Sequence, residues 1–168
     1  MNKVITRDLG GFSGRGYDKG RPLAVQALWF AVSNTVFQKW WLPSKLRPPI
    51  LRMFGAKIGS NVLIRHRVRI HWPWKLQVGS NTWLGEECWL INLEPITIGD
   101  NVCISQAALL CTGSHDPKSP TFEFDNAPIV VEDSAWIATR ATVLRGAVVG
   151  RGEVVPAMSV RKRQAAPR

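Results

Sequence analysis

An aliphatic residue recurs every six positions along most of the chain after residue 57, and no other feature constrains the fold as strongly. Within the uninterrupted hexads, the residue four positions after the aliphatic is small or β-branched, with Glu153 as the exception. Hexad repeats of this kind are typical of a parallel β-helix, in which three hexads form one triangular coil. The sequence therefore predicts an all-β domain of about five triangular coils over residues 56–160. The aliphatic series is Ile58, Ile64, Ile70, Val78, Leu84, Leu90, Ile98, Ile104, Leu110, Val131, Ile137, Val143, Val149 and Val155.

The spacing of the series breaks at three places. Ile58 to Val78 and Val78 to Ile98 each span 20 residues where three hexads require 18. Leu110 to Val131 spans 21 residues where one hexad requires 6. Each break follows the third hexad of a coil, so the extra residues are predicted to stack on one edge of the prism. The largest insertion, residues 111–128, is predicted to project from that edge as a loop.

His115 lies in this loop, and its setting favours catalysis. The unperturbed pKa of histidine, about 6.5, suits it to take a proton from an alcohol near neutral pH. Steps of 20 residues place Asn92 one coil, about 4.8 Å, from the base of the loop, with Trp72 and Trp74 one coil lower. We therefore expect a groove in which His115 is the general base and Asn92, Trp72, Trp74 and Asp116 contact the substrate.

A zinc site of the carbonic-anhydrase kind is the alternative use of the three histidines. The register places His66 on a different side of the coil from His71. His71 and His115 are about two coils, roughly 10 Å, apart. Nitrogens that share a zinc ion must come within about 4 Å of each other, so we expect no metal. A zinc site shared between subunits is left open.

Residues 1–55 do not follow the hexad and form a separate arm. Residues 1–20 are Gly-rich and polar, which indicates irregular structure. Apolar residues then fall near helical spacing from Pro22 to Trp40, and a second short helix is predicted from Pro49 to Phe54, ending at Gly55.

Two interpretations of this helical arm are open. It can cap the open end of the β-helix, or its tryptophans and lysines can meet a membrane interface. Tryptophan and lysine favour such an interface because each has an apolar body and a polar tip. The residues concerned are Trp29, Lys39, Trp40, Trp41 and Lys45.

The formal charge of +10 suits an anionic partner: a nucleic acid, a membrane surface or a polyphosphate cofactor. No zinc-finger, helix-turn-helix or RNA-recognition signature accompanies the basic residues, so we expect no nucleic acid. The three cysteines are odd in number and lack the spacing of a disulfide-bonded framework, which indicates free thiols in a reducing compartment. The first residues lack the apolar core of a signal peptide, and the apolar run 23–37 is shorter than the roughly 20 residues that span a bilayer. A cytoplasmic protein is expected.

Five segments carry a resemblance to a known family: Phe54–Gly59, His71–Gly79, Trp89–Asn101, Cys111–Phe122 and Pro128–Leu144. They resemble the hexapeptide-repeat O-acetyltransferases, and most closely those of colanic-acid biosynthesis. The resemblance implies a left-handed β-helix, which departs from the usual right-handed crossover. It also implies a homotrimer with active sites between neighbouring prisms.

The resemblance further implies roles for individual residues. His115 matches a general base that deprotonates a sugar hydroxyl, which then attacks the thioester of acetyl-CoA directly. Asn92 matches a residue of the acceptor site, and Trp136 an aromatic beside the pantetheine arm. Backbone amides near Ala138 and Thr139 match positions that hold the co-substrate and the developing oxyanion.

The match weakens towards the C-terminus, where Pro156 and Met158 replace glycines of the family pattern and its later nucleotide-binding segment is not found. The basic tail 161–168, with Arg161 and Lys162, is expected to meet the phosphates of CoA instead.

The predicted function is acetyl-CoA-dependent O-acetylation of a sugar in exopolysaccharide synthesis. The acceptor is a sugar or a lipid-linked oligosaccharide, and a lipid-linked acceptor would bring the arm to the inner membrane. The alternatives are a non-catalytic trimeric scaffold, suggested by the altered C-terminus, and the zinc enzyme.

Overall fold

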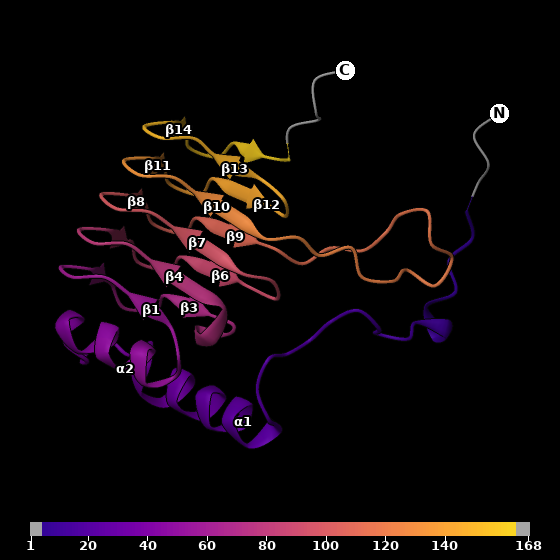
Figure 1. The fold of residues 1–168 in the computed structure, drawn as a ribbon, viewed down its shortest axis with the longest axis horizontal. Helices are drawn as coiled ribbons and strands as arrows, with labels where there is room; N and C mark the ends of the chain where they lie inside the picture. The colour runs from indigo at the N-terminus through magenta and orange to yellow at the C-terminus, as the bar shows by residue number, and fades with distance from the viewer. Residues whose placement is uncertain (1–4, 164–168) are drawn as a thin grey trace.

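The computed structural model describes residues 5–163, and its main body is a three-sided prism of stacked coils (Figure 1). Each side is a five-stranded parallel sheet, which confirms the predicted fold class. Sheet A holds β1 (Lys57–Ile58), β4 (Leu76–Val78), β7 (Ile96–Ile98), β10 (Ile129–Val131) and β13 (Val148–Val149). Sheet B holds β2 (Leu63–Ile64), β5 (Trp83–Leu84), β8 (Cys103–Ile104), β11 (Trp136–Ile137) and β14 (Val154–Val155). Sheet C holds β3 (Arg69–Ile70), β6 (Trp89–Ile91), β9 (Leu109–Cys111), β12 (Thr142–Leu144) and β15 (Val160–Arg161).

The strand register confirms the predicted lengths of the coils. Ile70 pairs with Leu90 and Leu90 with Leu110, two steps of 20 residues. The large insertion falls between Leu110 and its partner Val143. All three insertions lie at the corner where the chain passes from sheet C to sheet A. The first of them contains a short 3-10 helix, Pro73–Lys75.

The aliphatic residues of the hexad fill the prism, as predicted. Ile64, Leu84 and Leu110 are fully buried, and so is Cys88 from the second hexad position. Burial raises the pKa of the Cys88 thiol to about 12, so this cysteine is an inert core residue. Ile58 is half-buried because no coil lies beneath the first strand of sheet A.

The other two corners of each coil are tight turns with one residue in the left-handed region. Asn81 (φ 56°) and Glu87 (φ 63°) hold this position in the second coil. The glycines that directly follow the aliphatic residues are required for a steric reason, because the next coil leaves no room for a side chain there. A Cβ at Gly79 would lie 2.5 Å from the carbonyl carbon of Gly99.

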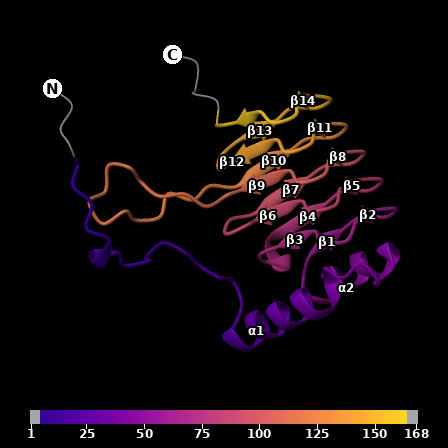
Figure 2. The same cartoon turned by 180° about the vertical axis from the view of Figure 1, so that it is seen from behind.

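Two helices lie across the first coil at one end of the prism (Figures 1 and 2). α1 (Leu23–Val32) continues as a π-helix over Ser33–Phe37, and α2 (Arg47–Met53) follows a 3-10 helix over Ser44–Leu46.

Both helix boundaries differ from the predicted ones. The first helix ends at Phe37 rather than Trp40, because polar side chains compete with its backbone bonds: Asn34 and Thr35 donate to the carbonyls of Phe30 and Ala31. The second helix begins at Arg47 rather than Pro49, since prolines suit a first helical turn.

The inner side of this helical segment caps the prism. Trp29 is buried, and its indole N–H donates to the carbonyls of Ile70 and His71 at 3.1 and 3.0 Å. Arg47 is also buried and donates to the carbonyls of Phe37 and Lys39 at 3.0 and 2.7 Å. No helix within residues 5–163 has the length and apolar character needed to cross a membrane.

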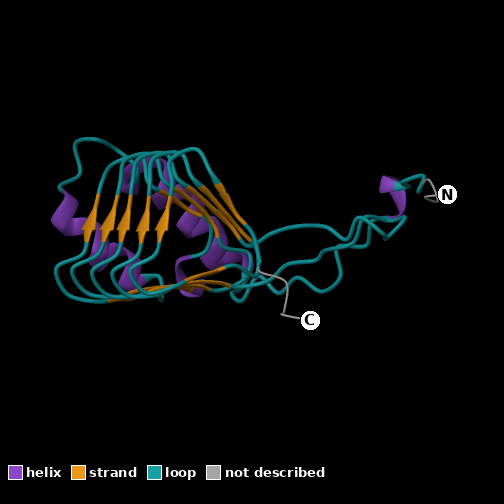
Figure 3. Cartoon of the chain, turned by 90° about the horizontal axis from the view of Figure 1, so that it is seen from above, coloured by secondary structure: helices purple, strands orange, loops and turns teal. Residues whose placement is uncertain are grey.

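The N-terminal arm follows an unexpected course. Residues 5–20 are irregular, as predicted, apart from a 3-10 helix over Leu9–Gly11. They run beside the long insertion, and the two segments extend together away from one corner of the prism (Figure 3). No repeat or motif in residues 5–20 predicts that the arm lies beside the loop.

Candidate functional site

The long insertion, residues 112–128, is a narrow loop whose two halves bond to each other. The amides of Asp116, Asp125 and Ala127 donate to the carbonyls of Glu123, Ser114 and Thr112 at 2.8, 2.9 and 3.1 Å. His115 and Phe124 face each other in an antiparallel bridge. The base of the loop is rooted in β9 and β10, so the prism fixes the position of His115.

The ring of His115 is half-buried among aromatic side chains. It stacks on Phe122 with centroids 4.3 Å apart and an interplanar angle of 7°, and on Phe124 at 5.3 Å. Phe12 of the arm meets it edge-on at 5.7 Å. Nδ1 of His115 lies 2.6 Å from the carbonyl oxygen of Phe122. The ring is therefore held by stacking on two sides and by one hydrogen bond.

The arm is tied to the tip of the loop by backbone and side-chain bonds. The amide and hydroxyl of Ser13 donate to the two oxygens of the Glu123 carboxylate at 3.0 and 2.9 Å. These bonds, first that of the Ser13 amide, lower the pKa of Glu123. The amide of Asp8 donates to the carbonyl of Pro120 at 2.8 Å. The alternation Phe122-x-Phe124 beside a histidine was the available signal for the aromatic cluster, and the sequence analysis missed it.

Trp72 and Trp74, predicted to line an open groove, lie beneath the arm instead. Their rings stack at 4.8 Å. The indole N–H of Trp72 donates to the hydroxyl of Tyr17, whose pKa is raised by burial, and that of Trp74 donates to the carbonyl of Lys19 at 2.7 Å. Their indole N–H groups therefore bind the arm.

Asn92 lies one coil above Trp72, as the register predicted, but its side chain is fully buried. Its carbonyl oxygen accepts from the amide of Trp72 at 2.9 Å, and its amide donates to the carbonyl of Trp72 at 2.5 Å. In this conformation Asn92 holds two coils together. The predicted contact between Asn92 and an acceptor remains a prediction.

Two further polar residues shape the loop. Asp116, also expected to contact substrate, accepts from the amide of Lys118 at 2.8 Å and so fixes a turn. Asn126 accepts from the amide of Ser114 at 3.0 Å. Its side-chain nitrogen is the one buried side-chain donor without a partner among the described residues.

The residues predicted to bind the co-substrate lie away from His115. Trp136 is on β11 of sheet B, the side of the prism opposite the corner that carries the loop. Its indole is half-exposed and donates to the hydroxyl of Ser105 at 2.9 Å. Ala138 and Thr139 follow at the corner between sheets B and C. One chain therefore does not bring these residues to His115.

The amide of Ala138 already has a hydrogen-bond partner in this structure. It donates to the carbonyl of Val155 on the next coil at 3.0 Å, and the role predicted for backbone amides near Ala138 remains a prediction. Thr139 lies in the exposed turn that follows, where its hydroxyl is 3.4 Å from the side-chain oxygen of Gln106.

A basic groove of ≈ 510 Å³ lies at the base of the His115 loop. Ser114 and Asp125 line it from the loop, and Arg145, Lys162 and Arg163 from the coil above. Arg145 pairs with Asp125. Lys162 thus lies at the same corner of the prism as the His115 loop, and its contact with the co-substrate remains a prediction.

Arg161, the other predicted phosphate-binding cation, already has partners within the chain. Its guanidinium pairs with Glu153 at 3.0 Å and donates to the carbonyl of Val148 at 3.0 Å, and its predicted contact with phosphate remains a prediction. Residues 164–168 of the predicted basic tail lie outside the described residues.

The remaining histidines are accounted for by structural contacts. Nε2 of His66 lies 2.7 Å from a carboxylate oxygen of Glu86. His71 packs edge-on against Trp72 at 4.3 Å, and desolvation, followed by the charges of Lys19 and Lys75, lowers its pKa. Within residues 5–163 no three His, Cys, Asp or Glu side chains gather in a group that could hold a metal ion.

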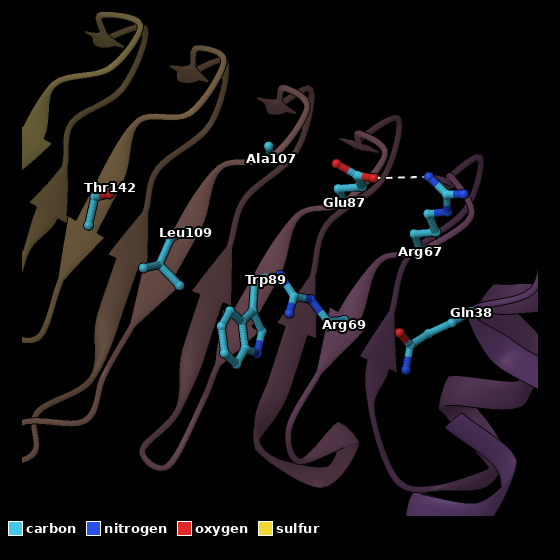
Figure 4. A pocket seen from close by; sticks show the side chains of 8 residues that line it. All are labelled: Gln38, Arg67, Arg69, Glu87, Trp89, Ala107, Leu109 and Thr142. Atoms are coloured by element: carbon cyan, nitrogen blue, oxygen red, sulfur yellow. Dashed lines mark hydrogen bonds and ion pairs between the residues drawn. The ribbon is translucent and has the colours of Figure 1, made fainter. Parts of the chain in front are cut away.

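A second groove, of ≈ 660 Å³, lies on the outward side of sheet C near the helices. Figure 4 shows Arg69 beside Trp89 and Arg67 linked to Glu87. The guanidinium of Arg69 lies 4.0 Å from the centre of the Trp89 ring. The described residues that line this groove include no histidine or cysteine, so the loop remains the candidate for chemistry.

No protein-family model matches the chain. Among curated proteins, WcaF of Escherichia coli K12, named as a colanic acid biosynthesis acetyltransferase, is 46% identical over 157 residues. The match covers 91% of this chain and 85% of WcaF. Galactoside O-acetyltransferase of Escherichia coli K12 is 24% identical over 117 residues, 68% of this chain and 58% of that enzyme.

Solved structures share the fold. The hexapeptide-repeat acetyltransferase VCA0836 of Vibrio cholerae, in its complex with acetyl-coenzyme A, superposes with a TM-score of 0.77 at 23% sequence identity. The superposition covers 89% of this chain and 83% of VCA0836.

Proposed function

The chain belongs to the hexapeptide-repeat acetyltransferases, in the group that includes WcaF, and from that premise we propose that it acetylates a sugar hydroxyl with His115 as the general base. The observation that carries the proposal is the contact between Nδ1 of His115 and the carbonyl oxygen of Phe122. The acetyl donor is acetyl-CoA, which is bound in the VCA0836 structure.

The carbonyl contact supports a base because it selects one form of the ring. A carbonyl oxygen can only accept, so Nδ1 carries the proton in the neutral imidazole. Nε2 then has a free lone pair, and the stacked phenyl rings limit the rotation of the imidazole. A neutral histidine with a fixed acceptor nitrogen is what proton abstraction from an alcohol requires.

The proposed reaction is direct transfer. Nε2 of His115 takes the proton of the sugar hydroxyl while the oxygen attacks the thioester carbon of acetyl-CoA. The tetrahedral intermediate collapses with cleavage of the C–S bond, and the CoA sulfur recovers the proton from Nε2. The products are the acetyl ester and CoA.

A homotrimer with sites shared between copies is part of the proposal. His115 projects from the corner between sheets C and A, whereas Trp136 and Thr139 lie on and beside sheet B. A single site that uses all three needs His115 from one copy and the sheet B surface from its neighbour. Closed symmetric assembly gives each copy the same pair of surfaces.

Lys162 and Arg163 are the cations we assign to the phosphates of acetyl-CoA. They replace Arg161, which is occupied by Glu153. Thr139 and Trp136 of the neighbouring copy would then meet the pantetheine arm. The acceptor is a sugar or a lipid-linked oligosaccharide of an exopolysaccharide, on the cytoplasmic side of the membrane.

The test compares wild type with His115→Ala and with the control His66→Ala. His66 is a partly exposed histidine like His115. It pairs with Glu86 at the corner between sheets B and C, away from the corner that carries the His115 loop. We expect His115→Ala to lower kcat by about 10²–10⁴-fold in an acetyl-CoA consumption assay over a panel of nucleotide sugars and lipid-linked oligosaccharides. His66→Ala should retain wild-type activity.

Calorimetric titration with acetyl-CoA completes this test. Unchanged acetyl-CoA affinity in His115→Ala would assign the loss to the chemical step. Activity of His115→Ala within a few-fold of wild type would refute the general base. Failure of the wild-type protein to bind acetyl-CoA at millimolar concentration would favour a non-catalytic scaffold.

A further inference from the structure

The outer side of α1 is apolar, although it faces away from the prism. The segment from Pro22 to Gln38 contains no charged residue. Within α1 only Trp29 is buried, while Leu23, Leu28 and Phe30 are 76%, 57% and 71% exposed. A surface helix of a globular protein normally carries charged or polar residues on its outer side, so this helix is built to be covered.

Exposed apolar residues continue beyond α1 along the helical segment. Trp40 is 79% exposed and Met53 83% exposed. The helical segment that carries these residues lies across the first coil at one end of the prism (Figure 2). We call this surface the apolar end face; it consists of Leu23, Leu28, Phe30, Trp40, Trp41, Leu46 and Met53.

The positive charge of the protein is concentrated around the same end. No Asp or Glu occurs between Asp18 and Glu86, a stretch that contains 11 Lys and Arg. The rest of the chain holds the other 11 Lys and Arg against all 12 Asp and Glu, so this stretch supplies the whole net charge of +10. Lys39, Lys45 and Arg52 are exposed within the helical segment, and further cations lie on the first coil.

From this combination we infer that the apolar end face docks onto the surface of an anionic phospholipid bilayer. Tryptophans with neighbouring lysines suit the lipid headgroup region, where rings reach the acyl boundary and ammonium groups meet phosphates. The positive charge of this stretch is complementary to anionic lipid, because the stretch contains no carboxylate that would neutralise its lysines and arginines. The helices are too short to span, so they would lie in the plane of the interface.

Docking in this way would direct the coils away from the bilayer. It also gives a physical reason for a lipid-linked acceptor, although the inference itself rests on exposure and charge and not on the chemistry of His115.

The experiment is co-sedimentation of the full chain with vesicles of phosphatidylethanolamine and phosphatidylglycerol, compared with vesicles of phosphatidylcholine alone. We expect binding to the anionic vesicles that weakens as salt is raised, because exposed charges are screened. Replacing Trp40→Ala and Trp41→Ala together should lower the partition coefficient about tenfold or more. Lys39→Gln with Lys45→Gln should reduce the preference for phosphatidylglycerol.

Trp83→Ala is the matched control. Trp83 is 57% exposed on the side of the prism and should bind vesicles as wild type does. Thermal unfolding and acetyl-CoA consumption with a soluble acceptor are followed in every variant. Trp40 and Trp41 are exposed and play no part in the proposed reaction, so both readouts should stay at wild-type values.

Three results would overturn the inference. One is no binding of wild type to anionic vesicles. Another is equal binding by Trp40→Ala/Trp41→Ala, which would assign contact to another surface. The third is a larger assembly of wild type without lipid that this variant loses, which would make the face a protein interface. Vesicle binding without acetyl transfer would count against the proposed function alone.

Discussion

The proposed chemistry of His115 depends on a backbone group as well as on side chains. The carbonyl of Phe122, seven residues along the chain, fixes the ring proton on Nδ1. Sequence spacing predicted the loop and selected His115, but this contact depends on how the two halves of the loop pair. The same limit applies at Ala138 and Arg161, whose predicted roles remain predictions. Each has the right chemistry for its predicted role, yet a neighbouring coil or carboxylate already uses it.

Two adjacent residues of β9 test which side chains point into the prism and which point outward. Leu110 is fully buried, whereas its neighbour Leu109 points outward and is partly exposed. Leu110→Ala should lower the free energy of unfolding by about 2–5 kcal/mol through lost burial and a residual cavity. Leu109→Ala should cost less than about 1 kcal/mol. Denaturant unfolding followed by circular dichroism measures both, and equal costs would contradict the assigned register.

The arm and the His115 loop pack together as one structural unit, although about a hundred residues separate them in sequence. Ser13 binds Glu123, Tyr17 binds Trp72, and Phe12 closes the aromatic cluster around His115. The hexad predicted the strands because it repeats locally at every coil. Contacts between the arm and the loop have no repeat, so nothing in the pattern of residues 1–20 indicated where the arm would lie.

Phe12→Ala tests whether the arm positions the base. Loss of the edge contact at 5.7 Å should loosen the imidazole and lower kcat about tenfold, with unchanged affinity for acetyl-CoA. Leu9→Ala is the control, since Leu9 lies in the same arm and is exposed. Phe12→Tyr should restore most of the activity. Equal kcat values for Phe12→Ala and Leu9→Ala would show that the arm does not position His115.

The prism as a whole divides the predicted site between two of its sides. Sheet C and sheet A meet at the loop, and sheet B with Trp136 lies opposite. The repeat predicted this prism, including the edge that collects the insertions, because each coil repeats the one before it. How copies assemble depends on the outward-pointing side chains, and the six-residue repeat does not restrict which residues occupy those positions. The shared site is therefore inferred from geometry and resemblance together.

Subunit complementation is the most direct measurement of this account. His115→Ala and Trp136→Glu should each be nearly inactive alone, the first without its base and the second with a carboxylate facing the anionic co-substrate. Co-expressed with different tags and purified as mixed trimers, they should recover about one third of wild-type activity, because in a ring of three copies that contains both variants one site in three pairs an intact His115 with an intact Trp136. Mixed oligomers no more active than the separate variants would contradict a site shared between copies.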